Sequence, residues 1–373
     1  MMKKKYSILF DSFHLYHLPQ FEPLLELLSQ DDRFVIYHST SKEIQKKEYE
    51  LCRKILADKP GQFISGEDEE ERKKKIQELD LDVFICGWSR YDIDQFVNEN
   101  TLVAMAYHGI GIKPSYWLDN HHRLDIRFVE GSYRMDQLRQ KGIKTDLALT
   151  GFMKLDYLFQ KDKIDTIPLI NKFNLDTTKK TILFAPTFYP SSFELLGLQL
   201  GEYTRDYNLL IKPHLWTMFM NKFAGINHKN QRDLFYKLED NFDHVHLIPP
   251  EMYNITPFYK ISDLLITEAS STIYEMLALD KPILVNRFYK LKLSHRLFKK
   301  RLYRARLNEE MEKDISEFCF EAHTPNELPS AINESLTNIK SKLTAMRIYK
   351  EKMFYGLDGE ASFRVRDKIL EKL

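Results

Sequence analysis

The chain has 373 residues, 43% of them hydrophobic and 29% charged, a composition typical of a soluble globular protein with two or three domains. Its 55 basic and 54 acidic residues nearly cancel, so overall charge gives no reason to expect nucleic acid as a partner. The three cysteines are scattered and form no CxxC pair, which argues against a disulfide framework or a cysteine zinc site and favours a reducing compartment.

The first residues, MMKKKYSILFDSF, are basic and then apolar, as in a signal peptide, but the apolar part ends at Asp11 after only five residues. We therefore expect a buried first strand there. Uncharged runs such as 101–112 are far shorter than the ~18 residues that span a bilayer. These patterns predict a cytoplasmic protein without a transmembrane segment.

Short apolar runs alternate with longer amphipathic stretches along the chain. Strands are predicted at 6–10, 34–37, 82–86, 101–107, 126–129 and 146–150, and then at 181–185, 207–212, 244–248, 263–267 and 283–285. Helices are predicted at 20–30, 67–79, 133–141, 152–161, 229–240, 251–260 and 271–280, and the chain is mostly helical from about Glu309. Apolar strands separated by helices indicate parallel sheets covered on both faces, the α/β class.

The polar segment 160–180 contains Pro168 and no clear strand, so we place a domain boundary near 165–178. This predicts a Rossmann-like domain over 1–165, a second over 178–350, and a helix in 351–373 that is a candidate for packing back on the first domain. Two such sheets facing a central cleft would bind ligands at the carboxyl ends of their strands.

The stretch SDLLITEASSTIYEMLALDKPILVN, residues 262–286, places three hydroxyls between a buried strand and a helix. Free backbone N–H groups and the helix dipole make such a junction suited to phosphate, with Ser270, Ser271 and Thr272 as further donors. Glu275 could accept hydrogen bonds from ribose hydroxyls. A single capping serine is the plain alternative, but capping leaves the role of Glu268 open.

Three more strand ends carry polar residues. Lys212 and His214 follow a strand in NLLIKPHLWT and could neutralise a phosphate, or be a surface lysine and a packed histidine. In AYHGIGIK, Gly109 and Gly111 allow close approach of backbone to a ligand, and His108 suits a general base, although a histidine that simply ends a strand fits almost as well.

The fourth strand end, LFAPTFYPSS, has Thr187 at its tip. Metal signals are weaker. The pairs with DxD or close histidine spacing are Asp80 and Asp82, Asp92 and Asp94, and His14 and His17, while His121 and His122 look like loop residues. Without a third ligand these give little reason to expect zinc, so we expect no metal.

The segment 287–306 carries nine Lys or Arg residues and no acid, around an apolar stripe of Leu293, Leu297, Phe298 and Leu302. This pattern suits an anionic membrane surface or a phosphorylated acceptor. A solvated helix that packs through its leucines is an equal alternative.

The order HGIG, APT, KPH and SDLLITEASS, with an acid four residues on, resembles the CDP-glycerol glycerophosphotransferase family over roughly residues 100–373. The element DG-x-A-S-x-R in YGLDGEASFRVRDKILEKL looks like the C-terminus of that family. These are teichoic acid and capsule polymerases and primases, and the resemblance implies a GT-B fold with an N-terminal acceptor domain and a C-terminal nucleotide-donor domain.

The resemblance also implies roles for the residues at the strand ends. His108 would deprotonate an acceptor hydroxyl, and Lys212 and His214 would hold the donor phosphates. The remaining donor-side residues would be Gly109, Gly111, Thr187, Ser270, Ser271 and Thr272, with Glu275 on the ribose. The hydroxyl would attack the glycerol-bearing phosphate and CMP would leave, without a metal or other cofactor.

The sequence departs from the family at Glu268-Ala269, where Asp-Tyr is usual, at Glu275, where Asp is usual, and after APT, where the usual arginine is missing. The favoured reading is transfer of glycerol or ribitol phosphate from a CDP-activated donor to a polymer or lipid-linked acceptor. A GT-B glycosyltransferase that uses a UDP-activated or other nucleotide sugar in capsule, teichoic acid or lipopolysaccharide synthesis is the alternative. Two lesser alternatives are an isomerase that resembles the UDP-GlcNAc 2-epimerases and a non-catalytic nucleotide- or membrane-binding protein. We expect a cytoplasmic location, with 287–306 as a candidate contact with the inner face of the plasma membrane.

Overall fold

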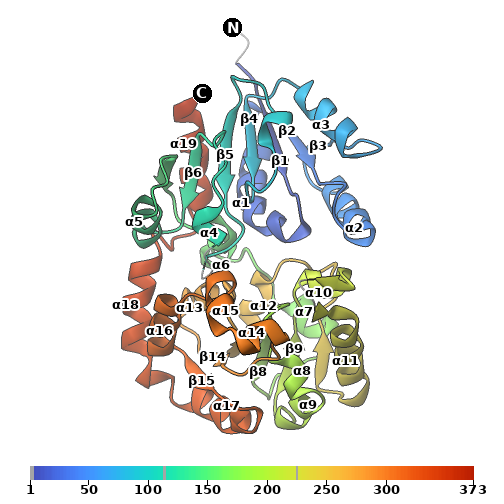
Figure 1. The fold of residues 1–373 in the computed structure, drawn as a ribbon, viewed down its shortest axis with the longest axis vertical. Coiled ribbons are helices and arrows are strands. Elements are labelled where there is room, and N and C mark those ends of the chain that lie inside the picture. The colour runs from blue at the N-terminus through green and yellow to red at the C-terminus, as the bar shows by residue number, and fades with distance from the viewer. Residues whose placement is uncertain (1–3, 112–114, 224–225) are drawn as a thin grey trace. The chain divides into compact units, whose positions relative to one another are not determined.

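The computed structural model describes residues 4–111, 115–223 and 226–373, which divide into two compact units (Figure 1). Unit 1 comprises Met1–Gly109, Trp117–Lys161 and Lys352–Leu373, and unit 2 comprises Ile110–Tyr116 and Asp162–Glu351. Each unit is built around its own parallel sheet flanked by helices. The predicted α/β class with two parallel sheets is confirmed.

The sheet of unit 1 has seven strands. Their spatial order is β3 (Gln62–Phe63), β2 (Phe34–Ser39), β1 (Tyr6–Asp11), β4 (Val83–Cys86), β5 (Leu102–Ala106), β6 (Ile126–Val129) and β7 (Asp146–Leu149). All pairs are parallel, and Ile8 of β1 lies beside Ile36 of β2 and Val83 of β4. Because the chain winds outward from β1 in both directions, the switch point lies between β1 and β4, where open α/β sheets bind ligands.

Helices cover this sheet on both faces. They are α1 (Leu18–Ser29), α2 (Lys46–Ala57), α3 (Glu69–Gln77), α5 (Ser132–Gln140), α6 (Asp156–Phe159) and α19 (Ala361–Lys372), with the 3-10 turns η1 (Leu15–His17), η2 (Ile93–Gln95) and η3 (Met153–Leu155). The short α4 (Ser115–Leu118) lies where the chain passes between units. Phe10 of β1 packs in one buried cluster with Phe21 and Leu24 of α1 and with Val365 and Ile369 of α19. The C-terminal helix is therefore part of the core of unit 1.

The DG-x-A-S-x-R element fixes α19 to unit 1. The buried Asp156 carboxylate accepts hydrogen bonds from the backbone N–H groups of Ala361 at 3.1 Å and Ser362 at 2.8 Å, and so satisfies donors that the first turn of a helix leaves open. Arg364 Nε donates to a backbone carbonyl just after β7 at 2.7 Å. Gly359 has a φ of +79°, which favours glycine. The DG-x-A-S-x-R element thus holds α19 against the rest of unit 1 through hydrogen bonds.

The sheet of unit 2 has six parallel strands. Their order is β12 (Val245–Leu247), β9 (Asn208–Ile211), β8 (Thr181–Ala185), β13 (Leu264–Thr267), β14 (Ile283–Asn286) and β15 (Phe320–Ala322). Ile182 lies beside Leu209 of β9 and Leu264 of β13, and all three belong to the buried core. The switch point of this sheet lies between β8 and β13.

Many short helices surround this sheet. They are α7 (Ile167–Lys172), α8 (Phe193–Leu196), α9 (Gln199–Tyr203), α10 (Leu215–Phe219), α11 (His228–Asn241), α12 (Thr256–Ile261), α13 (Thr272–Leu277), α14 (Leu293–Leu297), α15 (Lys299–Ala305), α16 (Glu309–Phe318), α17 (Leu328–Thr337) and α18 (Leu343–Met353), with the 3-10 turns η4 (Pro325–Glu327) and η5 (Ile339–Ser341). The short strands β10 (Lys222–Phe223) and β11 (Ile226–Asn227) form an antiparallel pair. No helix in the described ranges combines the length and hydrophobicity needed to cross a bilayer.

All eleven predicted strands are present, and the C-terminal part is mostly helical as predicted. The short strands β3, β10, β11 and β15 were not predicted, because two or three residues show no readable alternation. The helix expected over 251–260 begins only at Thr256, with a proline in its first turn. The helix expected over 271–280 ends at Leu277, ahead of Asp280, whose φ is +54°.

Candidate functional site

The sheet order brings the donor-side residues predicted in unit 2 to one edge of the sheet. Ala185, at the end of β8, lies beside Thr267 at the end of β13, and β9 is the other neighbour of β8. Thr187 follows β8, Lys212 and His214 follow β9, and Ser270, Ser271 and Thr272 follow β13. This edge includes the switch point of the sheet, the place where α/β domains bind ligands.

Glu268 holds together the loop that follows β8. It is fully buried, and its Oε2 accepts the backbone N–H of Thr187 at 2.6 Å. Its Oε1 accepts the backbone N–H of Ser192 at 2.9 Å, the hydroxyl of Ser192 at 2.6 Å and the hydroxyl of Ser191 at 3.3 Å. Burial raises the pKa of Glu268, whereas the hydrogen bonds from Ser192, Thr187 and Ser191 oppose that rise. Since all four partners are donors, the site is built for a carboxylate.

The role of Glu268 explains an acid that capping alone leaves unexplained. Its carboxylate points away from the helix that follows it in sequence and organises the neighbouring loop instead. The side chain of Thr187 is also part of this arrangement, because its hydroxyl donates to the carbonyl of Pro190. The sequence shows both residues at strand ends, but only the structure shows that they belong to one loop-anchoring network.

The three hydroxyls at the start of α13 are half-buried and make local contacts. Ser270 Oγ accepts the backbone N–H of Thr272 at 3.3 Å, and Ser271 Oγ donates to Glu275 Oε1 at 3.2 Å. Glu275 is fully buried, and its Oε2 accepts the hydroxyl of Tyr259 at 2.9 Å. Phosphate binding by the hydroxyls and ribose binding by Glu275 stay predictions. Ribose binding would require a ligand to reach the buried carboxylate of Glu275.

Lys212 and His214 are both held close to the end of β9. Lys212 is buried, and its backbone N–H bonds to Phe184 of β8 at 2.9 Å. His214 caps α10, because its Nδ1 accepts the backbone N–H of Trp216 at 3.1 Å, and its ring centroid lies 4.9 Å from that of Phe188. A neutral His214 that accepts at Nδ1 carries its proton on Nε2, which can then donate to a phosphate oxygen.

In unit 1, His108 follows β5 and is packed among aromatic rings. It stacks on His17, with centroids 4.7 Å apart and planes inclined by 24°, and on Tyr107 at 4.6 Å and 26°. His17 lies in η1, the turn that follows β1, so the carboxyl end of β1 at the switch point of unit 1 lies close to His108. Gly87 is required here, because a Cβ on it would lie 2.7 Å from the ring of His17.

The hydrogen bonding of His108 fixes its tautomer. His108 Nδ1 lies 3.1 Å from the carbonyl of Gly87, which can only accept, so a neutral ring carries its proton on Nδ1. Burial lowers the pKa of His108 to about 3; the Gly87 carbonyl opposes this shift, and Arg90, His14 and Lys154 add to it. The ring is therefore neutral near pH 7 with a lone pair on Nε2, the form that a general base requires.

Arg90 and Asp119 are neighbours of this site that sequence reasoning missed. Arg90 Nε donates to Asp119 Oδ2 at 3.1 Å, and its guanidinium also donates to the hydroxyl of Tyr107 at 2.7 Å. Asp119 Oδ1 accepts from both the backbone and the hydroxyl of Ser89 at 2.7 Å. No motif marks Arg90, and only its position four residues after β4 would have drawn attention to it.

Gly109 and Gly111 occupy the segment where the division between the two units falls. A Cβ on Gly111 would collide with the ring of Tyr116, so the chain's own packing already requires a glycine there. Residues 112–114 lie outside the described ranges. The predicted role of both glycines in donor binding stays a prediction.

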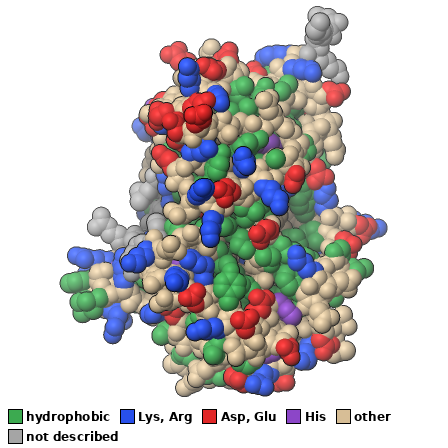
Figure 2. Space-filling model, turned by 90° about the vertical axis from the view of Figure 1, so that its right-hand side faces the viewer, with side chains coloured by type: hydrophobic (Ala, Val, Ile, Leu, Met, Phe, Trp, Pro, Cys, Tyr) green, Lys and Arg blue, Asp and Glu red, His purple; other side chains and the backbone are tan. Residues whose placement is uncertain are grey.

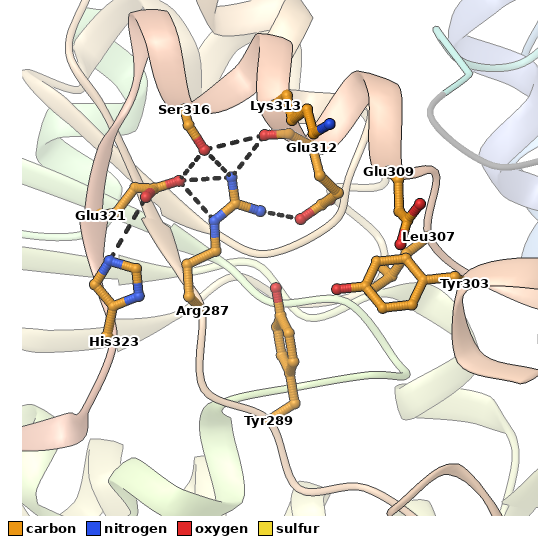
Figure 3. Close-up of a pocket in the computed structure, with 10 residues that line it drawn as sticks. All are labelled: Arg287, Tyr289, Tyr303, Leu307, Glu309, Glu312, Lys313, Ser316, Glu321 and His323. Carbon is orange, nitrogen blue, oxygen red and sulfur yellow. Dashed lines mark hydrogen bonds and ion pairs between the residues drawn. The ribbon is translucent and has the colours of Figure 1, made fainter. Parts of the chain in front are cut away.

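A cavity of about 480 Å³ lies beside the carboxyl ends of β14 and β15 in unit 2 (Figure 3). Its most prominent cation is Arg287, which forms ion pairs with Glu312 and, at 2.6 Å, with Glu321. Two tyrosines, Tyr289 and Tyr303, form another part of the wall. None of the predicted site residues lines this cavity, and its arginine is already neutralised by two carboxylates, so it does not have the charge of a diphosphate site.

The basic segment 287–306 forms two short helices, α14 and α15, that expose apolar side chains. Leu293 is 67% exposed, Leu297 66% and Phe298 54%, whereas Leu302 is buried. Green and blue side chains gather on a projection at the lower left of Figure 2, the side to which α14 and α15 turn from the front of Figure 1. The alternative in which these leucines pack the helix holds only for Leu302. The side chains of 304 and 305 lie outside the described part.

Comparison with known proteins places these observations in a family. The family model for CDP-Glycerol:Poly(glycerophosphate) glycerophosphotransferase matches residues 134–371. The teichoic acid ribitol-phosphate primase of Bacillus spizizenii is 25% identical over 236 residues, which are 59% of this chain and 51% of that protein. The teichoic acid poly(glycerol phosphate) polymerase of Bacillus subtilis is 30% identical over 144 residues, 36% of this chain and 18% of that protein. The chain thus spans about half the length of the first of these relatives and less of the second.

Solved structures show the same fold at low identity. A histidine-to-alanine variant of the wall teichoic acid polymerase TagF superposes with a TM-score of 0.67 and 15% identity, covering 98% of this chain and 89% of that chain. A UDP-N-acetylglucosamine 2-epimerase superposes with a TM-score of 0.58 and 16% identity, covering 99% and 96%. Because the family match includes well over half of the residues and all the donor-side motifs of unit 2, this chain belongs to the CDP-glycerol:poly(glycerophosphate) glycerophosphotransferase family.

Proposed function

We propose that the protein transfers an alditol phosphate, either glycerol phosphate or ribitol phosphate, from a CDP-activated donor to a hydroxyl of a teichoic-acid-type polymer or lipid-linked acceptor. The observation that carries this proposal is the family match over 134–371, which contains every predicted donor-side residue from Thr187 to Glu275. Named relatives include primases for both alditols and a polymerase of glycerol phosphate, so the family alone does not choose between glycerol and ribitol.

In the proposed reaction, His108 Nε2 accepts the proton of the acceptor hydroxyl while Nδ1 keeps its hydrogen bond to Gly87. The hydroxyl oxygen forms a bond to the alditol-bearing phosphorus, the bond from that phosphorus to the CMP oxygen breaks, and CMP leaves with the electron pair. The Lys212 ammonium and the Nε2–H of His214 would stabilise the negative charge on the phosphates. No metal is needed for this scheme, since cations and hydroxyls of the chain supply the neutralisation.

The low pKa of His108 has a consequence for the proposed mechanism. An imidazole with a pKa of about 3 is a weak base in the free protein, in part because Arg90 and Lys154 disfavour its protonated form. An anionic donor or acceptor bound nearby would offset these cations and raise the pKa toward the range in which a general base works best. Substrate binding would therefore activate the base.

The donor preference is the most direct test. Melting temperatures are compared with CDP-glycerol, CDP-ribitol, CMP, UDP and UDP-GlcNAc, because a ligand that binds only the folded protein stabilises it. A shift with the cytidine compounds alone supports the proposal. A shift with the uridine compounds alone would favour the nucleotide-sugar alternative, for which the S. aureus MnaA–UDP co-structure, at a TM-score of 0.60 and 14% identity, offers a similar fold only.

The role of His108 is tested by CMP release from the preferred donor in the presence of a lipid-linked acceptor. Loss of a general base typically costs ~10²–10⁴ in rate, so we expect His108→Ala to lose at least 100-fold while the thermal shift with donor stays near that of the unsubstituted protein. His323→Ala, at an exposed histidine of unit 2, is the matched control. Activity of His108→Ala within tenfold of the control would remove His108 from the mechanism.

We also propose that α14 and α15 contact an anionic membrane surface, the place where a lipid-linked acceptor is found. Exposed Leu293 and Leu297 would insert among lipids, and basic residues such as Lys299 and Lys300 would pair with headgroups. Leu293→Ser combined with Leu297→Ser should weaken sedimentation with vesicles that contain anionic lipid. Leu195→Ser, which removes a leucine that is 43% exposed elsewhere in unit 2, is the control. Equal sedimentation of both variants would refute the membrane contact.

A further inference from the structure

Two loops of unit 1 bring two histidines and an aspartate together at its surface. Asp94 lies in η2, and His121 and His122 lie in the loop before β6. One potential ligand atom from each of the three lies within 4.8 Å of the other two. His122 Nε2 is 2.9 Å from Asp94 Oδ2, and the ring centroids of the two histidines are 4.3 Å apart.

A second carboxylate adds negative charge to this cluster. Asp92 Oδ1 lies 3.8 Å from His121 Nε2. Two aspartate carboxylates therefore lie beside the two imidazole rings of the cluster. In the sequence, Asp92 and Asp94 form only a DxD spacing, and His121 and His122 are only adjacent loop histidines. Asp94 and His121 are 27 residues apart along the chain. Folding joins them, and neither pair alone would supply the three ligands that a metal site requires.

We propose that Asp94, His121 and His122 form a binding site for a borderline divalent cation such as Zn²⁺. Two imidazole nitrogens and a carboxylate oxygen are the ligand types that Zn²⁺ prefers, and the remaining positions would be filled by water or by Asp92. Mg²⁺ and Ca²⁺ prefer oxygen ligands and are disfavoured by the two histidines. The proposed metal is structural and takes no part in the transfer reaction.

The backbone around His121 is already ordered by hydrogen bonds. The N–H of His121 donates to the hydroxyl of Ser89 at 3.0 Å, and its Nδ1 accepts the backbone N–H of Arg123 at 3.2 Å. A neutral His121 therefore carries its proton on Nε2, and metal binding through Nε2 requires that proton to move to Nδ1 and the bond to Arg123 to be given up. His122 and Asp94 should consequently contribute more to affinity than His121.

The proposed cation would add a link between η2 and the loop that carries His121 and His122, beside the contacts of Asp92 with His121 and of Asp94 with His122. The loop that carries His121 also carries Asp119, whose carboxylate holds Ser89 and Arg90 after β4. A bound metal would link this loop to η2 and so restrict its opening. Stabilisation of unit 1 on addition of metal is the expected consequence, because a ligand that binds only the folded state raises its stability.

The test uses the full chain, freed of metal with a chelator. Titration with Zn²⁺ is followed by calorimetry, and titration with Co²⁺ by visible absorption. Cys52, Cys86 and Cys319 are all buried, so we expect no cobalt–thiolate absorption bands. We expect one ion per chain, and a rise in melting temperature with Zn²⁺ that a chelator reverses.

His122→Ala and Asp94→Asn should each weaken binding at least tenfold. The His122 side chain is 74% exposed, so its removal leaves the fold intact, and far-ultraviolet circular dichroism checks this for both variants. His323→Ala removes another exposed histidine, outside the cluster, and should leave the affinity unchanged. Absence of saturable binding at millimolar Zn²⁺, unchanged affinity in His122→Ala, or equal loss in His323→Ala would each overturn the proposal.

Discussion

Replacing Glu268 by glutamine removes a negative charge from a fully buried position while keeping the size of the side chain. The carboxylate accepts four hydrogen bonds, three at Oε1 and one at Oε2. A glutamine can place its carbonyl oxygen where Oε1 lies and keep the bonds to Ser191 and Ser192. Its NH₂ group then faces the backbone N–H of Thr187, and two donors oppose each other.

The expected cost follows from these contacts. A hydrogen bond to a charged group contributes roughly 1.5–3 kcal/mol, and a buried donor left without an acceptor costs roughly 1–3 kcal/mol. A neutral amide is less costly to bury than a carboxylate, which offsets part of this loss. We therefore expect Glu268→Gln to lower the free energy of unfolding of unit 2 by about 2–4 kcal/mol. For a domain of this size, each kcal/mol shifts the melting temperature by about 2–4 °C.

Differential scanning calorimetry measures this change, with Glu334→Gln as the matched control. Glu334 lies exposed on α17, where the same substitution should stay within about 0.5 kcal/mol. If the buried substitution costs no more than the exposed one, the carboxylate does not hold the loop as argued. Donor binding provides a second readout, since a displaced loop after β8 should weaken the thermal shift with the preferred nucleotide.

Three further results are expected. Between pH 7.5 and pH 5 the unfolded chain takes up a proton at residue 108, whose ordinary pKa is 6.5, while folded His108, with a pKa of about 3, stays neutral. Lowering the pH over this range should therefore reduce the free energy of unfolding by about 2 kcal/mol through this residue. Urea unfolding of His108→Phe should show a correspondingly flatter pH dependence. Asp156→Asn places an amide NH₂ group against one of the two N–H donors at the start of α19 and should cost about 1–3 kcal/mol in the unfolding of unit 1, with faster hydrogen exchange in α19 than in α1 as its signature. Arg287→Met removes the arginine from Glu312 and Glu321, of which Glu321 keeps its contacts with Ser316 and His323, and should cost about 3–5 kcal/mol at pH 7; since burial raises the pKa of Glu312, the loss should shrink as pH falls and that group is protonated, and an undiminished loss at pH 5 would contradict this explanation.

The strands were predictable from the sequence because most of them are runs of apolar residues buried on both faces. Ile8, Leu9 and Phe10 are all inaccessible to solvent, and so are Leu264, Leu265 and Ile266. Such runs need no partner to be recognised. The sheet order was not readable, yet it decides which strand ends are neighbours and therefore which polar residues form one edge.

Contacts between residues distant in sequence were beyond prediction for the same reason. Nothing local in Glu268 indicates the backbone of Ser192, 76 residues earlier, and nothing in Asp156 indicates the start of α19, 205 residues later. Both acids satisfy backbone N–H groups that the fold leaves open. The sequence predicts where such groups occur, at loops and helix starts, but the acid that serves them is chosen by the three-dimensional arrangement.

The structure shows what surrounds two positions at which the sequence departs from the family pattern, Glu268 and the residues after APT. Glu268, where the family usually has aspartate, is buried and bound to the loop after β8, so the longer side chain bears on how that loop is held. The arginine usual after APT is missing, but a cation still lies beside that loop, since Arg306 Cζ lies 5.3 Å from the ring of Phe188. Glu275 is the third departure and the one at the predicted ribose position, so the donor choice depends on what cytidine and uridine contact, which the melting experiment addresses directly.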